Sequence, residues 1–103
     1  MVSKHYKAQR NERDKFIKEH LGGDGKVIDS FILDKGHIHG KEKHDVTENG
    51  IIVIYNAETN KLVTRLIARE WQIKRLYNNV GREPPQWLVD LARYHESLGY
   101  NNR

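Results

Sequence analysis

The feature that most constrains the fold of this chain is a run of five strand-forming residues, Ile51–Tyr55. Isoleucine, valine and tyrosine favour extended backbone because their side chains pack well on the pleated surface of a sheet. A second strand pattern, Lys61–Ile67, begins after the short, turn-rich segment Asn56–Asn60. Two strands joined by so short a loop predict an antiparallel hairpin, in which Asn60 can take the left-handed conformation.

Helix and strand patterns flank this hairpin on both sides. Before it, Lys4–Leu21 is rich in helix formers, and Lys26–Lys35 has the composition of a strand. The polar segment that follows leaves room for a short strand at His44–Thr47. After the hairpin, apolar spacing predicts helices over Arg69–Val80 and Pro84–Leu98. This order predicts an α+β fold with an N-terminal helix, a small antiparallel sheet of three to four strands and two C-terminal helices.

The length of 103 residues and the composition narrow the class of protein. The chain has room for one hydrophobic core, so residues 1–103 are expected to form a single domain. It contains no cysteine, which excludes disulfides and thiolate chemistry. We find neither an apolar run near the roughly 20 residues that span a bilayer nor a secretory signal pattern, so we expect a cytoplasmic protein without a membrane partner. The net charge of +4 favours RNA or another nucleic acid as the partner.

The segment before the hairpin contains three histidines, His37, His39 and His44. Three interpretations of them stay open. They could bind a metal ion, because His37 and His39 would lie on the same side of an extended segment, although the spacing matches no strong zinc pattern. They could transfer protons, since histidine has an ordinary pKa of about 6.5 and serves as acid or base near neutral pH. They could also belong to a solvated loop without a specific function.

Proton transfer by histidine suits the cleavage of RNA by its own 2′-hydroxyl. That reaction needs a base, an acid and cations that hold the phosphate charge, but no metal ion and no cofactor. His37 and His44 are the candidate acid–base pair. On the second strand of the hairpin, Arg65 would stabilise the phosphate and Thr64 would position the substrate. These four residues form the predicted catalytic set.

Basic and aromatic residues in and around the hairpin are the candidates for nucleic-acid binding. Single-stranded RNA is bound by aromatic rings that stack on bases and by cations that pair with phosphates. The helix from Arg69 onward interleaves such residues, although we expect its Trp71 to anchor the helix on the sheet. The full set of candidate binding residues is Lys35, Tyr55, Arg69, Lys74, Arg75 and Arg82.

Several short runs between Leu33 and Tyr77 carry a resemblance to a known family. These runs are Asp34–His37, Glu42–His44, Asn49–Gly50, Ile51–Asn56, Lys61–Thr64 and Ile67–Arg69. Together they resemble small uncharacterised proteins encoded in phages and prophages of Gram-positive bacteria, and they are loosely similar to the barnase–EndoU–colicin–RelE superfamily of small RNases and toxins. The resemblance implies an N-terminal helix on a short antiparallel sheet that cuts RNA without a metal ion. A histidine before the hairpin, His37 or His44, matches that pattern, whereas the two helices after the hairpin depart from it.

Two functions stay open from the sequence. The first is a metal-independent endoribonuclease or RNase-like toxin that uses histidine acid–base catalysis. The second is a phage or prophage accessory protein that binds nucleic acid, or inhibits a host nucleic-acid enzyme, without cutting RNA. A protein partner, such as an antitoxin or a host enzyme, is compatible with both.

Overall fold

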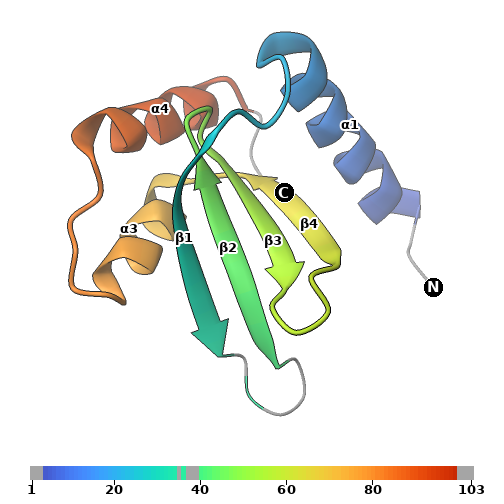
Figure 1. Ribbon diagram of the computed structural model, residues 1–103. Coiled ribbons are helices and arrows are strands. Elements are labelled where there is room, and N and C mark those ends of the chain that lie inside the picture. Colours follow the sequence, from blue (N-terminus) through green and yellow to red (C-terminus); the bar gives the residue numbers. More distant parts are fainter. Residues whose placement is uncertain (1–3, 35, 37–39, 100–103) are drawn as a thin grey trace.

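The computed structural model describes residues 4–34, 36 and 40–99, with side chains described from residue 11 onward. Its helices and strands follow the predicted order (Figure 1). They are α1 (Lys4–His20), β1 (Val27–Asp34), β2 (Lys41–Thr47), β3 (Ile51–Asn56), β4 (Leu62–Ile67), α3 (Glu70–Asn78) and α4 (Gln86–Ser97). The predicted α+β fold, with a helix before the sheet and two helices after it, is confirmed.

The four strands form one antiparallel sheet in the order β1-β2-β3-β4. The predicted hairpin consists of β3 and β4, and Asn60 in its loop has a φ of 61°. β2 spans Lys41–Thr47 and is longer than the short strand expected at His44–Thr47. It lies between β1 and β3, so backbone pairing on both sides extends it through polar residues whose composition alone does not indicate a strand.

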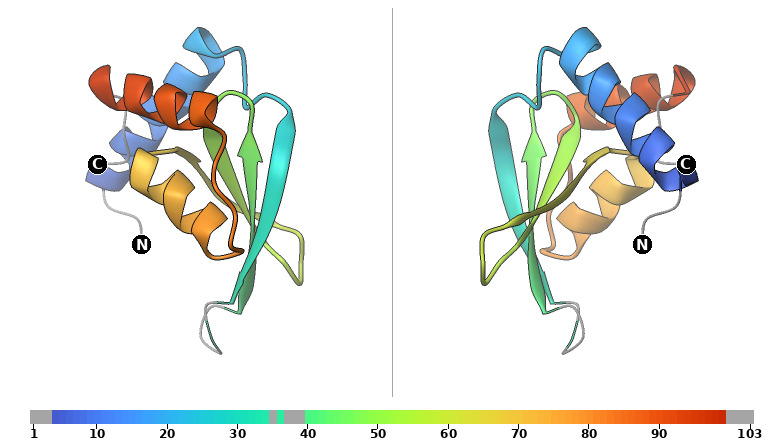
Figure 2. Two further views of the ribbon diagram at one scale, coloured as in Figure 1. Left: turned by 90° about the vertical axis from the view of Figure 1, so that its left-hand side faces the viewer. Right: turned by 90° about the vertical axis from the view of Figure 1, so that its right-hand side faces the viewer.

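Alternation of side chains along the strands gives the sheet two faces with different coverings. One face packs against α3 and α4, which lie together on one side of the sheet (Figure 2). To this core β3 contributes Ile52 and Ile54, and α3 contributes Ile73 and Leu76. Burying one such side chain stabilises the fold by roughly 1.5–3 kcal/mol. We call this surface of the sheet the helix-covered face.

The opposite face of the sheet is covered at one end only. Ile51 and Ile67 pack there against Phe16 of α1, and α1 lies alongside β4 at the edge of the sheet (Figure 1). Further along, Ile32 on β1 is 58% exposed and Val63 on β4 is 53% exposed. We call this uncovered part the open face. The register of the strands places Ile32, Lys43, Tyr55, Leu62 and Arg65 on it. Val63, the unpaired residue of the irregularity in β4, is assigned to it by alternation from Thr64.

The buried side of α3 does not include Trp71. Its buried residues are Ile73, Leu76 and Tyr77. Trp71 lies on the other side of the helix and is exposed, so the prediction that it anchors the helix to the sheet is wrong.

Within the described ranges, no helix combines the length and the apolar character needed to cross a bilayer.

Gly50, in the turn between β2 and β3, is a position where we expect a single added methyl group to destabilise the fold. Its φ of 76° is left-handed, which costs a residue with a Cβ atom about 1–2 kcal/mol. A Cβ there would also lie 3.2 Å from Cδ2 of Leu91. Gly22 has a similar φ of 73°, but a Cβ there would meet nothing within 4 Å. In urea denaturation, Gly50→Ala should therefore lower the free energy of unfolding more than Gly22→Ala, and equal losses would contradict the packing contribution.

Candidate functional site

The residues predicted to catalyse RNA cleavage do not all lie on one face. His37, and with it Lys35 of the predicted binding set, lies outside the described residues. His44 and Thr64 share the helix-covered face, where they occupy one cross-strand row with Ile54 between them.

Arg65 and Tyr55 project from the opposite face of the sheet, as alternation along β3 and β4 requires. Tyr55 is partly buried against the cluster that includes Phe16 and Ile17 of α1. Of the predicted site residues, His44 and Thr64 therefore lie on one face of the sheet, and Arg65 and Tyr55 lie on the other.

The ring of His44 is packed in the core of the sheet. It is only 4% exposed and lies between Phe31 and Ile54 of the neighbouring strands. Its Nε2 atom lies 3.2 Å from Oε1 of Glu42, which is two positions earlier on the same face. The Glu42 side chain is 19% exposed, so solvent reaches this member of the pair more readily. For His44, the interpretation as part of a solvated loop is wrong.

Arg13 of α1 is a candidate site residue that the sequence prediction missed. Its Nη2 atom donates a hydrogen bond to Oγ1 of Thr64 at 3.4 Å. Its Nε–H group is buried without a hydrogen-bond partner, an arrangement that costs about 1–3 kcal/mol and is rare in native proteins. The available signal was the position of this arginine beside Phe16 and Ile17 on the apolar side of the predicted first helix.

A pocket of about 270 Å³ lies where α1 passes the edge strand β4. Its lining residues are Asn11, Arg13, Asp14, Leu62, Val63, Thr64 and Arg65. Because β4 is an edge strand, side chains from both of its faces reach this pocket. The register between β3 and β4 is also irregular at this point, as is common beside functional sites. We call this cavity the β4-edge pocket.

Arg65 lies between the β4-edge pocket and a second hollow of about 310 Å³. Its Nε–H donates to the carboxylate of Asp24 at 3.2 Å. A guanidinium has five N–H donors, so this bond leaves others for a ligand. The β4-edge pocket thus presents the guanidinium groups of Arg13 and Arg65 and the hydroxyl of Thr64, with Asp14 as the carboxylate in its lining.

Two of the predicted cations belong to α3: Arg69 is its N-cap residue and Lys74 lies in its middle. The Arg69 backbone N–H donates to the Gln72 side chain at 2.9 Å and so satisfies a group at the helix end. Lys74 lies 2.6 Å from Glu70, which also accepts two hydrogen bonds from Arg93 of α4. These partners, Arg93 first, lower the pKa of Glu70 to about 2. Lys74 is therefore part of a surface network that joins two helices.

The other predicted cations, Arg75 and Arg82, contact aromatic rings. The Arg75 guanidinium lies 5.2 Å from the ring centre of Trp71, and that of Arg82 lies 5.3 Å from the ring centre of Tyr77. Arg82 also lies 3.2 Å from Asp29. Contacts of this kind contribute about 0.5–1 kcal/mol each at exposed sites. Both cations thus stabilise the chain's own surface.

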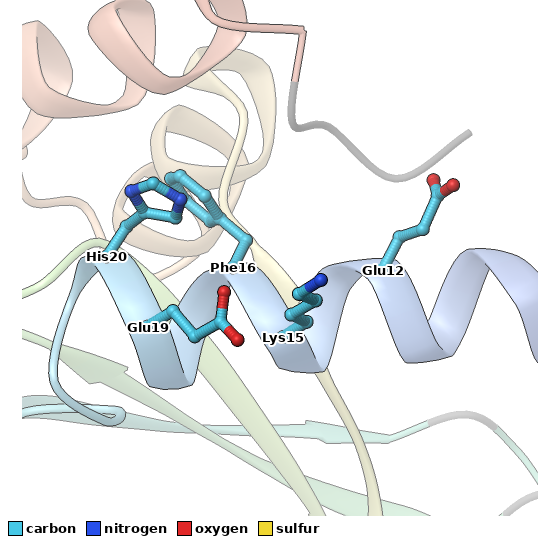
Figure 3. Close-up of a pocket in the computed structure, with 5 residues that line it drawn as sticks. All are labelled: Glu12, Lys15, Phe16, Glu19 and His20. Carbon is cyan, nitrogen blue, oxygen red and sulfur yellow. The ribbon is translucent and has the colours of Figure 1, made fainter.

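A larger hollow, of about 440 Å³, lies along α1 (Figure 3). It is lined by Glu12, Lys15, Phe16, Glu19 and His20. The His20 ring stacks on Phe16 at 5.2 Å, and Phe16 meets the buried ring of His95 edge-on at 5.7 Å. Burial lowers the pKa of His95, so its ring is neutral at pH 7. These histidines pack against a phenylalanine, and the hollow contains no residue of the predicted catalytic set among its described lining.

Comparison with known proteins finds no relative whose function could be transferred to this chain. No family model, no curated protein and no solved structure matches the chain. Within the described ranges, no three His, Asp or Glu side chains lie close enough together to hold a metal ion, and His37 and His39 fall outside those ranges. Two guanidinium groups beside a hydroxyl, as in the β4-edge pocket, suit the oxygens of a phosphate.

Proposed function

We propose that this protein is a metal-independent endoribonuclease that holds RNA by its phosphates at the β4-edge pocket. The observation that carries the proposal is the meeting of Arg13, Thr64 and Arg65 in that pocket. Arginine presents its donors in a planar fork that matches phosphate oxygens, and the net charge of +4 attracts a polyanion. The resemblance of residues 33–77 to phage-encoded proteins and small RNases supports the same substrate class.

Proton transfer in this proposal is assigned to the segment around His44. A base removes the 2′ proton, the 2′ oxygen bonds to phosphorus, and the bond from phosphorus to the 5′ oxygen breaks as an acid protonates that oxygen. We assign the base to Glu42, because its carboxylate is the more exposed member of the pair with His44. His37 is kept as the acid on the sequence pattern alone.

The spacing of the strands decides which phosphate the pocket holds. His44 and Thr64 are separated by β3, so two strand spacings, about 10 Å, lie between their backbones. A phosphate in the β4-edge pocket is too far from Glu42 to be the one that is cut. We therefore assign the pocket to a neighbouring phosphate of the same RNA strand, held so that the cut bond lies near Glu42.

The first test is incubation of the purified protein with labelled single-stranded RNA in excess EDTA. The proposal expects fragments that end in a 2′,3′-cyclic phosphate. RNA that stays intact but shifts on a native gel would contradict the proposed cleavage and support RNA binding alone. RNA that is neither cut nor shifted would contradict both.

Replacing Thr64 with valine should weaken RNA binding while the fold is kept. The change preserves the shape of the side chain and removes one hydroxyl, and a hydrogen bond contributes about 0.5–1.5 kcal/mol, so the loss should be about two- to tenfold. Thr59→Val, an exposed threonine in the loop between β3 and β4, is the matched control. Fluorescence anisotropy with labelled RNA measures both. Equal RNA affinities of the two variants would mean that the Thr64 hydroxyl does not bind a phosphate.

A second candidate function is RNA binding without cleavage, as in an accessory protein that inhibits a host nucleic-acid enzyme. The burial of His44 favours it, because a ring that is 4% exposed does not reach a substrate directly. The same assay in EDTA separates the two functions, since this candidate expects a shift and no fragments.

A further inference from the structure

We propose that the open face stacks an unpaired RNA base on the ring of Tyr55, so that the ligand is a single strand and not a duplex. The proposal rests on the proposed function for the identity of the ligand as RNA. It does not require that the RNA is cut. It is carried by the side chains of the open face and by their continuity with the β4-edge pocket.

Tyr55 lies in a cross-strand row with Lys43 of β2 and Ile32 of β1. The Lys43 ammonium lies 5.0 Å from the centre of the Tyr55 ring. The ammonium lies over the face of the ring, so a base that stacks there takes its place and leaves the ammonium to pair with a phosphate. The ring and the cation thus provide the two contacts that single-stranded RNA needs, namely stacking for a base and charge for a phosphate. In a duplex the base faces are already stacked, so a duplex cannot use this ring.

Apolar side chains extend the surface on both sides of Tyr55. Ile32 and Val63 are each more than half exposed. Single exposed apolar residues are common on protein surfaces, so the residues around them decide whether this surface binds a partner and of what kind. Here the neighbours include the cations Lys43 and Arg65, together with the exposed Lys41 at the start of β2. We therefore assign the surface to a polyanion with flat apolar bases.

Two carboxylates lie on the same side of the sheet, and both are engaged by the chain's own donors. Asp45 is 6% exposed; it accepts a hydrogen bond from the Ser30 hydroxyl at 2.7 Å and lies 3.6 Å from Lys43. Asp34 accepts a hydrogen bond from the Gly36 backbone N–H at 2.8 Å. Lys43 offsets the charge of Asp45, and the exposed Asp34 pairs across the strands with Lys41, so a cation stands beside each carboxylate.

The open face and the β4-edge pocket are continuous. Val63 and Arg65 belong to both, since they project from the open face and also line the pocket. Tyr55 pairs with Leu62, the neighbour of Val63 and another lining residue of the pocket. Because residues of both faces line the pocket, a strand with one phosphate there can place the base on one side of that phosphate on Tyr55, while the other side of the strand extends over the helix-covered face toward Glu42.

The experiment measures the affinity for a probe that cannot be cut. A fluorescent single-stranded oligonucleotide of 2′-O-methyl RNA lacks the free 2′-hydroxyl, so its binding is independent of cleavage. We expect Tyr55→Leu to lower the affinity for this strand roughly tenfold, because stacking on one base is worth about 1–3 kcal/mol by alanine substitution. Tyr55→Phe, which keeps the ring, should bind within about twofold of the parent. Tyr94→Leu, at an exposed tyrosine of α4, is the control and should match the parent.

A duplex of the same sequence is the second probe, and the parent should bind it more weakly than the single strand. Equal binding of the single strand by Tyr55→Leu and the parent would overturn the inference, as would equal losses for strand and duplex. A parent that binds no RNA would also overturn it and would favour a protein partner for Ile32 and Val63. A parent that binds the blocked strand through Tyr55 but leaves ordinary RNA intact would support the inference and contradict the cleavage.

Discussion

Glutamine in place of Glu42 should slow RNA cleavage by about a hundredfold or more, because general acid–base catalysis contributes about 10²- to 10⁴-fold. The amide keeps the size of the side chain and can still bond to His44, whose Nε2 lies 3.2 Å away. It cannot accept the 2′ proton. The affinity for the blocked 2′-O-methyl strand should stay at the parental value, since Glu42 is not among the lining residues of the β4-edge pocket. Single-turnover cleavage in EDTA at pH 7 measures the loss.

The control for this substitution is Glu58→Gln, which removes an exposed carboxylate in the loop between β3 and β4. It should cleave at the parental rate. If Glu42→Gln cleaved RNA at the parental rate, the pair of Glu42 and His44 would have a structural role only. His44→Gln needs a urea denaturation curve beside its rate, because the ring is buried and its loss can act through the fold.

The fold could be predicted from the sequence because its local signals agree with one another. Ile51–Tyr55 and Lys61–Ile67 are strands by composition and a hairpin by loop length, and the structure has them so. The length of β2 could not be predicted. The segment Lys41–Lys43 is polar and joins the sheet only because β1 and β3 pair with it on both sides. No local sequence pattern indicates this pairing.

The candidate site was predictable only in part. Alternation along β4 already placed Thr64 and Arg65 on different faces. Thr64 and Arg65 still reach one pocket because β4 is an edge strand and α1 lies beside it. These two features belong to the tertiary structure, and no local sequence pattern indicates them. For the same reason Arg13 was missed, since its contact with Thr64 joins residues 51 positions apart. The partner of His44, in contrast, is Glu42 on the same strand, where the spacing of two residues could have indicated it.

Tyr77 should be among the residues whose truncation costs the most stability. The side chain is fully buried between α3 and the sheet, and its ring packs edge-on against Phe31 with 4.8 Å between centres. Its hydroxyl donates a hydrogen bond to the carboxylate of Asp29 on β1. Tyr77→Ala leaves a cavity and should lower the free energy of unfolding by roughly 3–5 kcal/mol, as for other buried aromatic residues. Urea denaturation followed by circular dichroism measures it.

Tyr77→Phe separates the ring from the hydroxyl. It keeps the packing and removes one hydrogen bond, and Asp29 retains Arg82 at 3.2 Å, so the loss at pH 7 should be about 1 kcal/mol. Burial, and then the bond to Asp29, raises the pKa of the Tyr77 phenol above its ordinary value of about 10. The folded protein therefore keeps this proton at a pH where the unfolded chain has lost it. The stability that it provides is complete below about pH 10 and falls as the pH rises further. Tyr77→Phe should lose less stability than the parent between pH 9 and about pH 11. Parallel losses would mean that the hydroxyl does not hold its proton in the fold.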